Sequence, residues 1–236
     1  MIRKMKNIAA AALFVLSVFG TCGCADINVN VDVREAENPE SPKEIREETY
    51  KKAYLDKIEE LLSAGLADQF AFTYIDGDEI PELIASDSEG SFDHENAFIF
   101  TAAKDEAVKL AGVIAGVDGA CLDFSEGKNI IHISGAAEGM RDVFSKIADG
   151  TLEEAFSAEA VGEDEDAEYS VNGKRVTEDE YYAELAGFTE TCAGLKRISY
   201  DGLYEVSYKL EDGYGYFEQG SFDKYSTPEE IAEKLK

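Results

Sequence analysis

Three carboxylates in one short stretch have the spacing best suited to chemistry. Asp76 and Asp78 flank Gly77, and Glu82 follows four residues after Asp78. Calcium takes about six to eight oxygen ligands, and the loops that bind it place acidic side chains at alternate positions. If Asp76 takes the third position of such a loop, Glu82 falls at the ninth, where an acidic ligand is common. The stretch predicts a weak calcium site formed by Asp76, Asp78 and Glu82, with backbone carbonyl groups and water as further ligands.

A structural interpretation of the same stretch stays open. Tyr74 stands where a calcium loop has its first carboxylate, and Glu79 stands where it has its turn glycine. An Asp-Gly-Asp sequence also makes a tight connection between strands, because its carboxylates accept backbone N–H bonds. Pro81 would then stiffen the exit from this connection.

Residues typical of catalysis are scarce elsewhere. The chain has two histidines, His94 and His132. His132 alternates with Ile131 and Ile133, which predicts an ordinary strand residue that points away from them. His94 lies in an acidic loop and could add one metal ligand. The motifs of serine hydrolases, zinc proteases, P-loop proteins and C-x-x-C oxidoreductases are absent from the sequence. We therefore expect no catalytic residues and a protein that is not an enzyme.

The N-terminus predicts export. Arg3, Lys4 and Lys6 precede an apolar run over residues 9–19, which is the pattern of a signal peptide. The five residues after this run end in Gly23-Cys24, which resembles the lipobox of bacterial lipoproteins. In that family the leader is removed before the cysteine, whose sulfur then carries lipid. The resemblance implies a signal peptide over residues 1–23, lipidation at Cys24 (alternatively at Cys22), and a membrane anchor on the extracellular face. Residues 24–41 are expected to form a flexible tether before a single domain over residues 42–236.

Composition limits the partners. The chain has 50 acidic and 22 basic residues and a formal net charge of −28. Such a charge repels phosphates, so nucleic acid is excluded as a partner, and the lipid rather than the surface would bind the membrane.

Two cysteines, Cys121 and Cys192, remain besides those at the expected anchor. They could form a disulfide in an exported protein or remain buried thiols, and both alternatives stay open.

The hydrophobic pattern predicts an α+β fold, with an N-terminal helix packed on an antiparallel β-meander and short C-terminal helices. A helix is expected from Pro42 to Gly65, with apolar residues at steps of three and four, and shorter helices are expected over residues 177–187 and from 227 to the end. For residues 138–148 and 151–158, helix is kept as an alternative to strand. Strands with tight turns between them are expected over residues 69–75, 82–86, 97–102, 108–114, 120–124, 129–134, 140–148, 152–160, 169–171, 175–176, 204–210 and 214–216.

Three segments resemble a known group of proteins. Residues 74–84 are similar to the D-x-D-G-D-G-x-P-E-L-I loop of exported lipoproteins of Gram-positive anaerobic bacteria, where it joins two strands after a helix. Residues 169–181 are similar to a recurring strand, Asn-Gly turn and capped helix of the same proteins, and residues 225–235 are in keeping with their closing helix. Most of these proteins have no assigned activity, so the resemblance implies location and architecture.

Aromatic residues crowd the C-terminal part of the chain, and they suggest two functions. We expect a lipid-anchored, non-enzymatic binding or surface module, in which the aromatic residues pack between strands. The alternative is a carbohydrate-active or sugar-binding accessory protein that uses surface carboxylates and these tyrosines. Neither a protein nor a carbohydrate partner can be named from the sequence. The aromatic residues concerned are Tyr200, Tyr204, Tyr208, Tyr214, Tyr216, Phe217, Phe222 and Tyr225.

Overall fold

The structure is a computed structural model that describes residues 42–90, 95–103, 106–115, 120–135, 139–162, 167–192, 194–211 and 214–236. The expected signal peptide and tether lie outside these ranges. So do Cys22, Cys24 and His94, and the predictions made for them are not addressed by the structure. Residues 40–236 form one compact unit.

A small sheet follows the first helix, α1 (Pro42–Ala64). Its four strands are antiparallel and pair in chain order. The strands are β1 (Gln69–Thr73), β2 (Glu82–Ser86), β3 (Ala97–Ala103) and β4 (Glu106–Val113).

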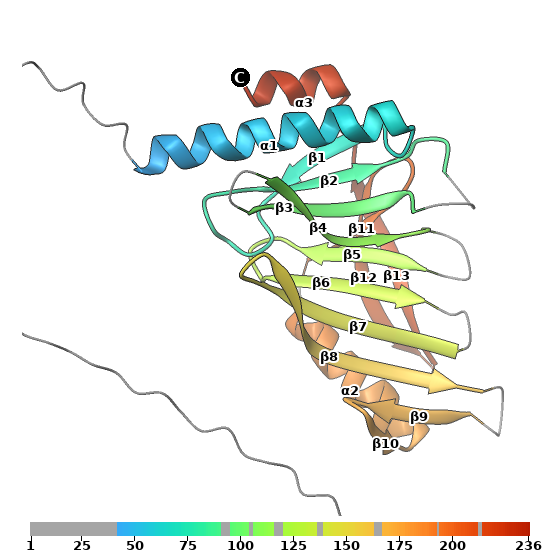
Figure 1. Ribbon diagram of the computed structural model, residues 1–236. Helices are drawn as coiled ribbons and strands as arrows, with labels where there is room; N and C mark the ends of the chain where they lie inside the picture. The colour runs from blue at the N-terminus through green and yellow to red at the C-terminus, as the bar shows by residue number, and fades with distance from the viewer. Residues whose placement is uncertain are drawn as a thin grey trace, which may run out of the picture. The chain divides into compact units, whose positions relative to one another are not determined.

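Two helices cover one face of this sheet. In Figure 1, α1 and α3 (Pro228–Lys234) lie beside each other along the small sheet. The expected apolar stripe of α1 faces inward, because Tyr54, Ile58 and Leu61 are buried in one cluster with Ile231 of α3. A capping box between Thr227 and Glu230 begins α3, as the sequence predicts. The C-terminus is thereby tied to the N-terminal helix.

The large sheet has nine antiparallel strands in the order β10-β9-β8-β7-β6-β5-β11-β12-β13. From β5 to β10 the chain forms a meander, then passes through α2 (Glu178–Thr191) and returns so that β11 pairs with β5. The strands are β5 (Cys121–Ser125), β6 (Ile130–Gly135), β7 (Gly139–Ala148), β8 (Thr151–Val161), β9 (Glu168–Val171), β10 (Lys174–Val176), β11 (Leu195–Ile198), β12 (Leu203–Glu211) and β13 (Tyr214–Asp223).

The predicted fold class, α+β with an N-terminal helix on antiparallel strands, is confirmed. The helical alternative for residues 138–148 and 151–158 is wrong, because the described residues of both segments, 139–148 and 151–158, are strand and are joined at Asp149 and Gly150. The two turn residues have φ angles of 50° and 76°, which a tight hairpin turn of this type requires. Strand β11 was not expected from the sequence, and neither was the division of the strands between two sheets.

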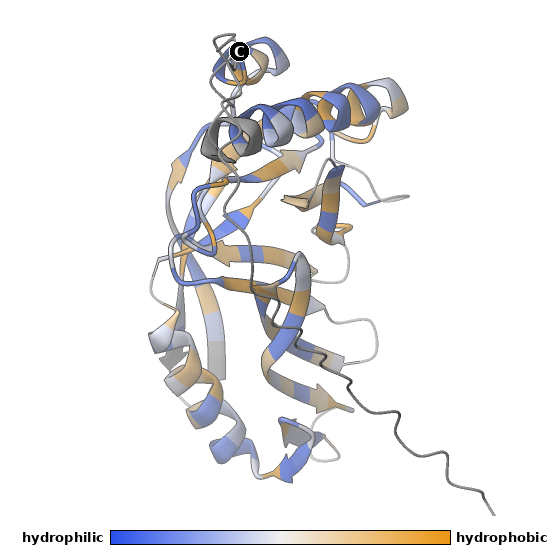
Figure 2. Ribbon diagram, turned by 60° about the vertical axis from the view of Figure 1, so that its left-hand side comes forward, coloured by the Kyte–Doolittle hydropathy of each residue, from blue (hydrophilic) through white to orange (hydrophobic). Residues whose placement is uncertain are grey.

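Both faces of the central strands of the large sheet are covered. One face packs against the small sheet around Leu122, Phe124 and Ile131. The opposite face packs against α2, with Phe144 and Tyr181 in its core. Figure 2 shows hydrophobic and hydrophilic residues alternating along many of the strands. Polar residues on the α2 side of the central strands are therefore buried, although they alternate with apolar residues as exposed ones would.

Candidate functional site

The acidic stretch forms the connection between β1 and β2. Asp76 Oδ1 accepts a hydrogen bond from the Asp78 backbone N–H at 3.0 Å, and Asp78 Oδ1 accepts one from the Ile80 N–H at 2.6 Å. Gly77 between them has a φ angle of 78°, which a side chain would disfavour. The two aspartates thus stabilise consecutive turns, as in the structural interpretation of the sequence.

Glu82 points into the protein and closes this connection from inside. It is only 1% exposed, and its Oε2 accepts the Ile75 N–H at 2.8 Å. Thr101 Oγ1 lies 3.5 Å from its other oxygen. Burial raises the pKa of Glu82 to about 7, against the opposing effect of the Ile75 N–H bond. Glu82 can therefore take up a proton near neutral pH.

The three carboxylates predicted as metal ligands do not form one ligand set. No group of three or more histidine, cysteine, aspartate and glutamate side chains that could hold a metal ion occurs in the part of the chain that the structure describes. Asp76 and Asp78 bond to the turn itself, whereas Glu82 is turned into the core. Calcium binding by this loop stays a sequence-based prediction, which the separate hydrogen bonds of these side chains do not favour.

The two cysteines of the domain lie in different environments, and the structure joins neither in a disulfide. Cys121 starts β5, where its side chain hydrogen-bonds to Ser134. Cys192 is buried after α2 and contacts the Phe188 carbonyl at 3.4 Å. Burial raises the pKa of both thiols, which disfavours the reactive thiolate.

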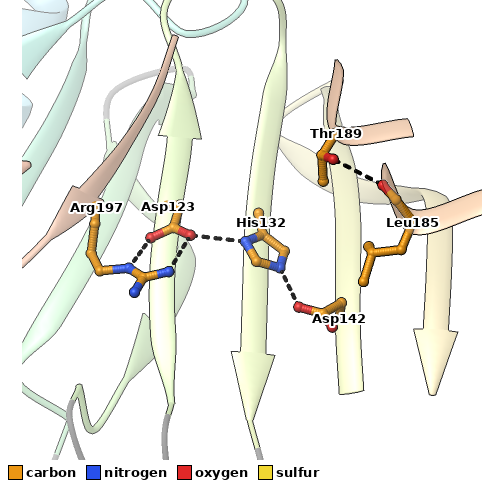
Figure 3. A network of polar contacts seen from close by, with 6 residues as sticks. All are labelled: Asp123, His132, Asp142, Leu185, Thr189 and Arg197. Carbon is orange, nitrogen blue, oxygen red and sulfur yellow. Dashed lines mark hydrogen bonds and ion pairs between the residues drawn. The ribbon is translucent and has the colours of Figure 1, made fainter. Parts of the chain in front are cut away.

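Charged side chains form a buried network in the large sheet (Figure 3). His132 Nδ1 lies 2.9 Å from Asp123 Oδ2, and its Nε2 lies 2.9 Å from Asp142 Oδ1. Arg197 reaches Asp123 from the other side with two bonds, Nε to Oδ1 at 2.8 Å and Nη2 to Oδ2 at 3.0 Å. These four residues, here called the charge network, come from the neighbouring strands β11, β5, β6 and β7.

Strand register places these groups together. Arg197 is directly opposite Asp123, and Asp123 is directly opposite His132. His132 faces Phe144 in the next strand, and Asp142 is two residues before Phe144 on the same side. One face of four strands therefore carries alternating positive and negative groups.

Burial sets the electrostatics of the network. Asp123 and His132 are each 0% exposed and Asp142 is 1% exposed. Burial alone would lower the pKa of His132, but its hydrogen bonds to the two carboxylates, together with their charge, raise it to about 9. Burial likewise opposes ionisation of Asp123, yet the bonds from His132 and Arg197 bring its pKa below the usual value. At neutral pH the His132 imidazole and the Arg197 guanidinium are thus positive and the Asp123 carboxylate is negative, while Asp142 Oδ1 accepts from the second ring nitrogen of His132.

Aromatic rings enclose the imidazole. Phe144 stacks on His132, with 4.1 Å between the ring centroids and an interplanar angle of 13°. The ring centroid of Phe217 lies 5.2 Å from that of His132, although Phe217 belongs to β13, at the end of the large sheet. The Arg197 guanidinium lies 5.5 Å from the centre of the Phe217 ring. These rings shield the imidazole, which is 0% exposed, whereas the Arg197 side chain at the end of the network keeps 15% of its surface exposed.

Sequence reasoning missed this network. His132 does point away from Ile131, as predicted, but that face is covered and the residue is not an ordinary strand histidine. Two acidic residues in predicted strands, Asp123 and Asp142, could have indicated the network, because aspartate is uncommon in strands. The other missing part was Arg197, because β11 itself was not recognised.

Several of the C-terminal aromatic residues pair across strands. Tyr204 faces Phe222 and Tyr208 faces Phe217, with ring centroids 5.2 Å apart in both pairs. This arrangement agrees with the packing interpretation for these four residues. Tyr200 differs, because it lies in the turn between β11 and β12 and is 58% exposed.

Comparison with known proteins adds no relative. No family model, no curated protein and no solved structure matches this chain. The resemblance of residues 74–84 to exported lipoproteins therefore stays a sequence-based expectation.

Removing Arg197 should destabilise the fold strongly. Arg197→Met leaves the buried Asp123 carboxylate without its bidentate partner, which should lower the free energy of unfolding by about 3–5 kcal/mol. Arg175→Met is the matched control, since Arg175 pairs with Glu168 on the surface and both side chains are more than half exposed; it should cost less than about 1 kcal/mol. Urea unfolding measures both, and equal small losses would contradict a structural role for the network.

Stability should fall at alkaline pH. The pKa of His132 is raised on folding, so its contribution is complete below the unfolded pKa and is lost as pH rises through about 9. Raising the pH from 7 to 10 should cost roughly 3 kcal/mol, by the size of this shift. Urea unfolding across this range should show the loss in the native protein but not in His132→Gln, and a reduced loss in Asp142→Asn. If both variants lose as much stability between pH 7 and pH 10 as the native protein does, the loss does not come from His132.

The acidic loop should hold its shape without metal. Asp76→Asn and Asp78→Asn retain the side-chain oxygens that accept the turn bonds, so each should change the free energy of unfolding by less than about 0.5 kcal/mol. Because those oxygens already serve the turn, millimolar calcium should leave the melting temperature unchanged. A rise in melting temperature with calcium that Asp76→Asn abolishes would establish the calcium site instead.

Proposed function

We propose that this protein is an extracytoplasmic binding module, held to the membrane by lipid, without enzymatic activity. The observation that carries the non-enzymatic part is the complete burial of His132 within the charge network. His132 is the one histidine in the described ranges, both its ring nitrogens bond to carboxylates, and it has no exposed surface. General acid–base catalysis requires such a group within hydrogen-bond reach of a substrate. The network instead supports a rigid scaffold that presents a surface.

The N-terminal sequence supports the location. Positive residues, an apolar run and Cys24 follow one another as in a lipoprotein leader. Within the helices that the structure describes, none is both long and apolar enough to cross a membrane. On this proposal the lipid on Cys24 is the membrane attachment, and the acidic surface keeps the domain in water.

A second candidate function is sugar binding without hydrolysis. The exposed ring of Tyr200 favours it, since an aromatic face in water is a ready contact for the apolar face of a sugar. Hydrolysis would need two accessible carboxylates on either side of the glycosidic bond. Glu82 has a raised pKa but is buried and bonded to the loop, so it does not supply one of them.

Replacing the anchoring cysteine tests the proposal. Cys24→Ala should move the protein from the membrane fraction to the soluble fraction after cell lysis, because the acylated sulfur is lost. Cys22→Ala is the matched control and should stay with the membranes. Immunoblots of the separated fractions measure both. Retention of both variants in the membrane fraction would contradict anchoring through these cysteines.

A further inference from the structure

Four segments distant in the sequence meet around a shallow hollow of about 500 Å³. They are the start of β1, the turn after β2, the turn between β11 and β12, and the connection from β13 to α3. We call this hollow the Tyr200 groove. The residues that line it include Asp68, Gln69, Ser88, Tyr200, Asp201 and Tyr225.

Hydrogen bonds fix the groove in advance of any ligand. The backbones of Phe70 and Ser226 bond to each other in both directions, at 2.8 and 3.3 Å. Tyr225 donates from its hydroxyl to the Ser199 carbonyl at 2.9 Å. Asp68 accepts from both the backbone and the hydroxyl of Ser88, at 2.8 and 2.6 Å. A ligand would therefore not have to order these segments, which removes one cost of binding.

The groove offers an aromatic face beside hydrogen-bond acceptors. Tyr200 is 58% exposed although its ring is large and apolar. Gln69 Oε1 is buried and has no hydrogen-bond partner within the described part of the protein. A buried acceptor left without a donor is costly, so a ligand hydroxyl would relieve this cost once the Gln69 side chain turns its oxygen toward the groove. The Asp201 carboxylate, which accepts from Tyr204 at 2.8 Å, adds acceptor oxygens at the rim.

These groups fit a polyhydroxyl ring compound. A sugar ring has one apolar face that can lie on Tyr200 and equatorial hydroxyls that can donate to Gln69 and Asp201. The hollow is within the range of about 300–1,000 Å³ typical of small-ligand sites. Anionic glycans are disfavoured, because the chain carries a formal net charge of −28.

We propose that the Tyr200 groove binds a neutral saccharide. This inference rests on the proposed function, since it names the ligand class of the binding module. Tyr200 supplies the stacking surface, and Gln69 and Asp201 orient the hydroxyl groups. The contact is small and open to water, so the affinity for a short sugar is in the millimolar range.

Calorimetry on the full purified chain tests the proposal with three neutral probes: maltotetraose, cellotetraose and triacetylchitotriose. At least one should bind. For that sugar Tyr200→Ala should weaken binding about tenfold, a loss of about 1.4 kcal/mol, and Gln69→Ala should weaken it in the same direction. Tyr216→Ala is the matched control, because Tyr216 is 43% exposed on β13 and does not line the groove; it should bind as the native protein does.

Two results would overturn the saccharide site. One is the absence of binding heat with all three sugars at millimolar concentration. The other is binding that Tyr200→Ala and Tyr216→Ala affect equally. Neither result bears on the proposed membrane attachment, because the fractionation of Cys24→Ala tests that proposal independently. Conversely, sugar binding by a protein whose Cys24 and Cys22 variants both stay with the membranes would support the groove and contradict the proposed anchor.

Discussion

A buried imidazolium between two carboxylates links the central strands of the large sheet. Removing an ion from water costs several kcal/mol even after the protein relaxes, so a buried charge persists only with well-placed partners. Here positive and negative groups alternate from Arg197 through Asp123 and His132 to Asp142, at 2.8–3.0 Å. Each of the four strands contributes one member of the network. The strand register that gives these contacts is thereby fixed electrostatically as well as by packing.

The same network explains why the face of the central strands that carries it must be covered. Water at His132 would weaken its ion pairs, because their strength depends on a low local dielectric. Phe144 and Phe217 exclude it, and Phe217 comes from β13, which is four positions from β6 in the sheet order. The sheet must curl to bring these strands together. The charged groups of the network are then held rigidly inside the sheet, which suits the proposed scaffold with binding groups on its surface.

Local patterns were enough to predict most elements of this fold. The stripe on α1, the capping boxes and the Asn-Gly and Asp-Gly turns are signals within a few residues, and they predict the order of helices and strands. Whether a face of a sheet is packed against another element depends on residues far apart in the sequence, so no local pattern predicts it. Alternation around His132 predicts one apolar face but does not tell whether the other face meets water or α2. Strand β11 is four residues long with Lys196 and Arg197 at its centre, too short and polar to be recognised. For the acidic loop, the two bonds made by Asp76 and Asp78 follow from turn chemistry, whereas the inward direction of Glu82 depends on the sheet behind it.

The charge state of His132 at neutral pH tests the central claim most directly. In ¹⁵N-detected NMR of the native protein at pH 7, both ring nitrogens of His132 should carry a proton and exchange it slowly with water, since each donates to a buried carboxylate. Comparison with His94→Gln assigns the resonances. A neutral ring, with one nitrogen unprotonated at pH 7, would contradict the presence of a buried imidazolium that donates from both ring nitrogens.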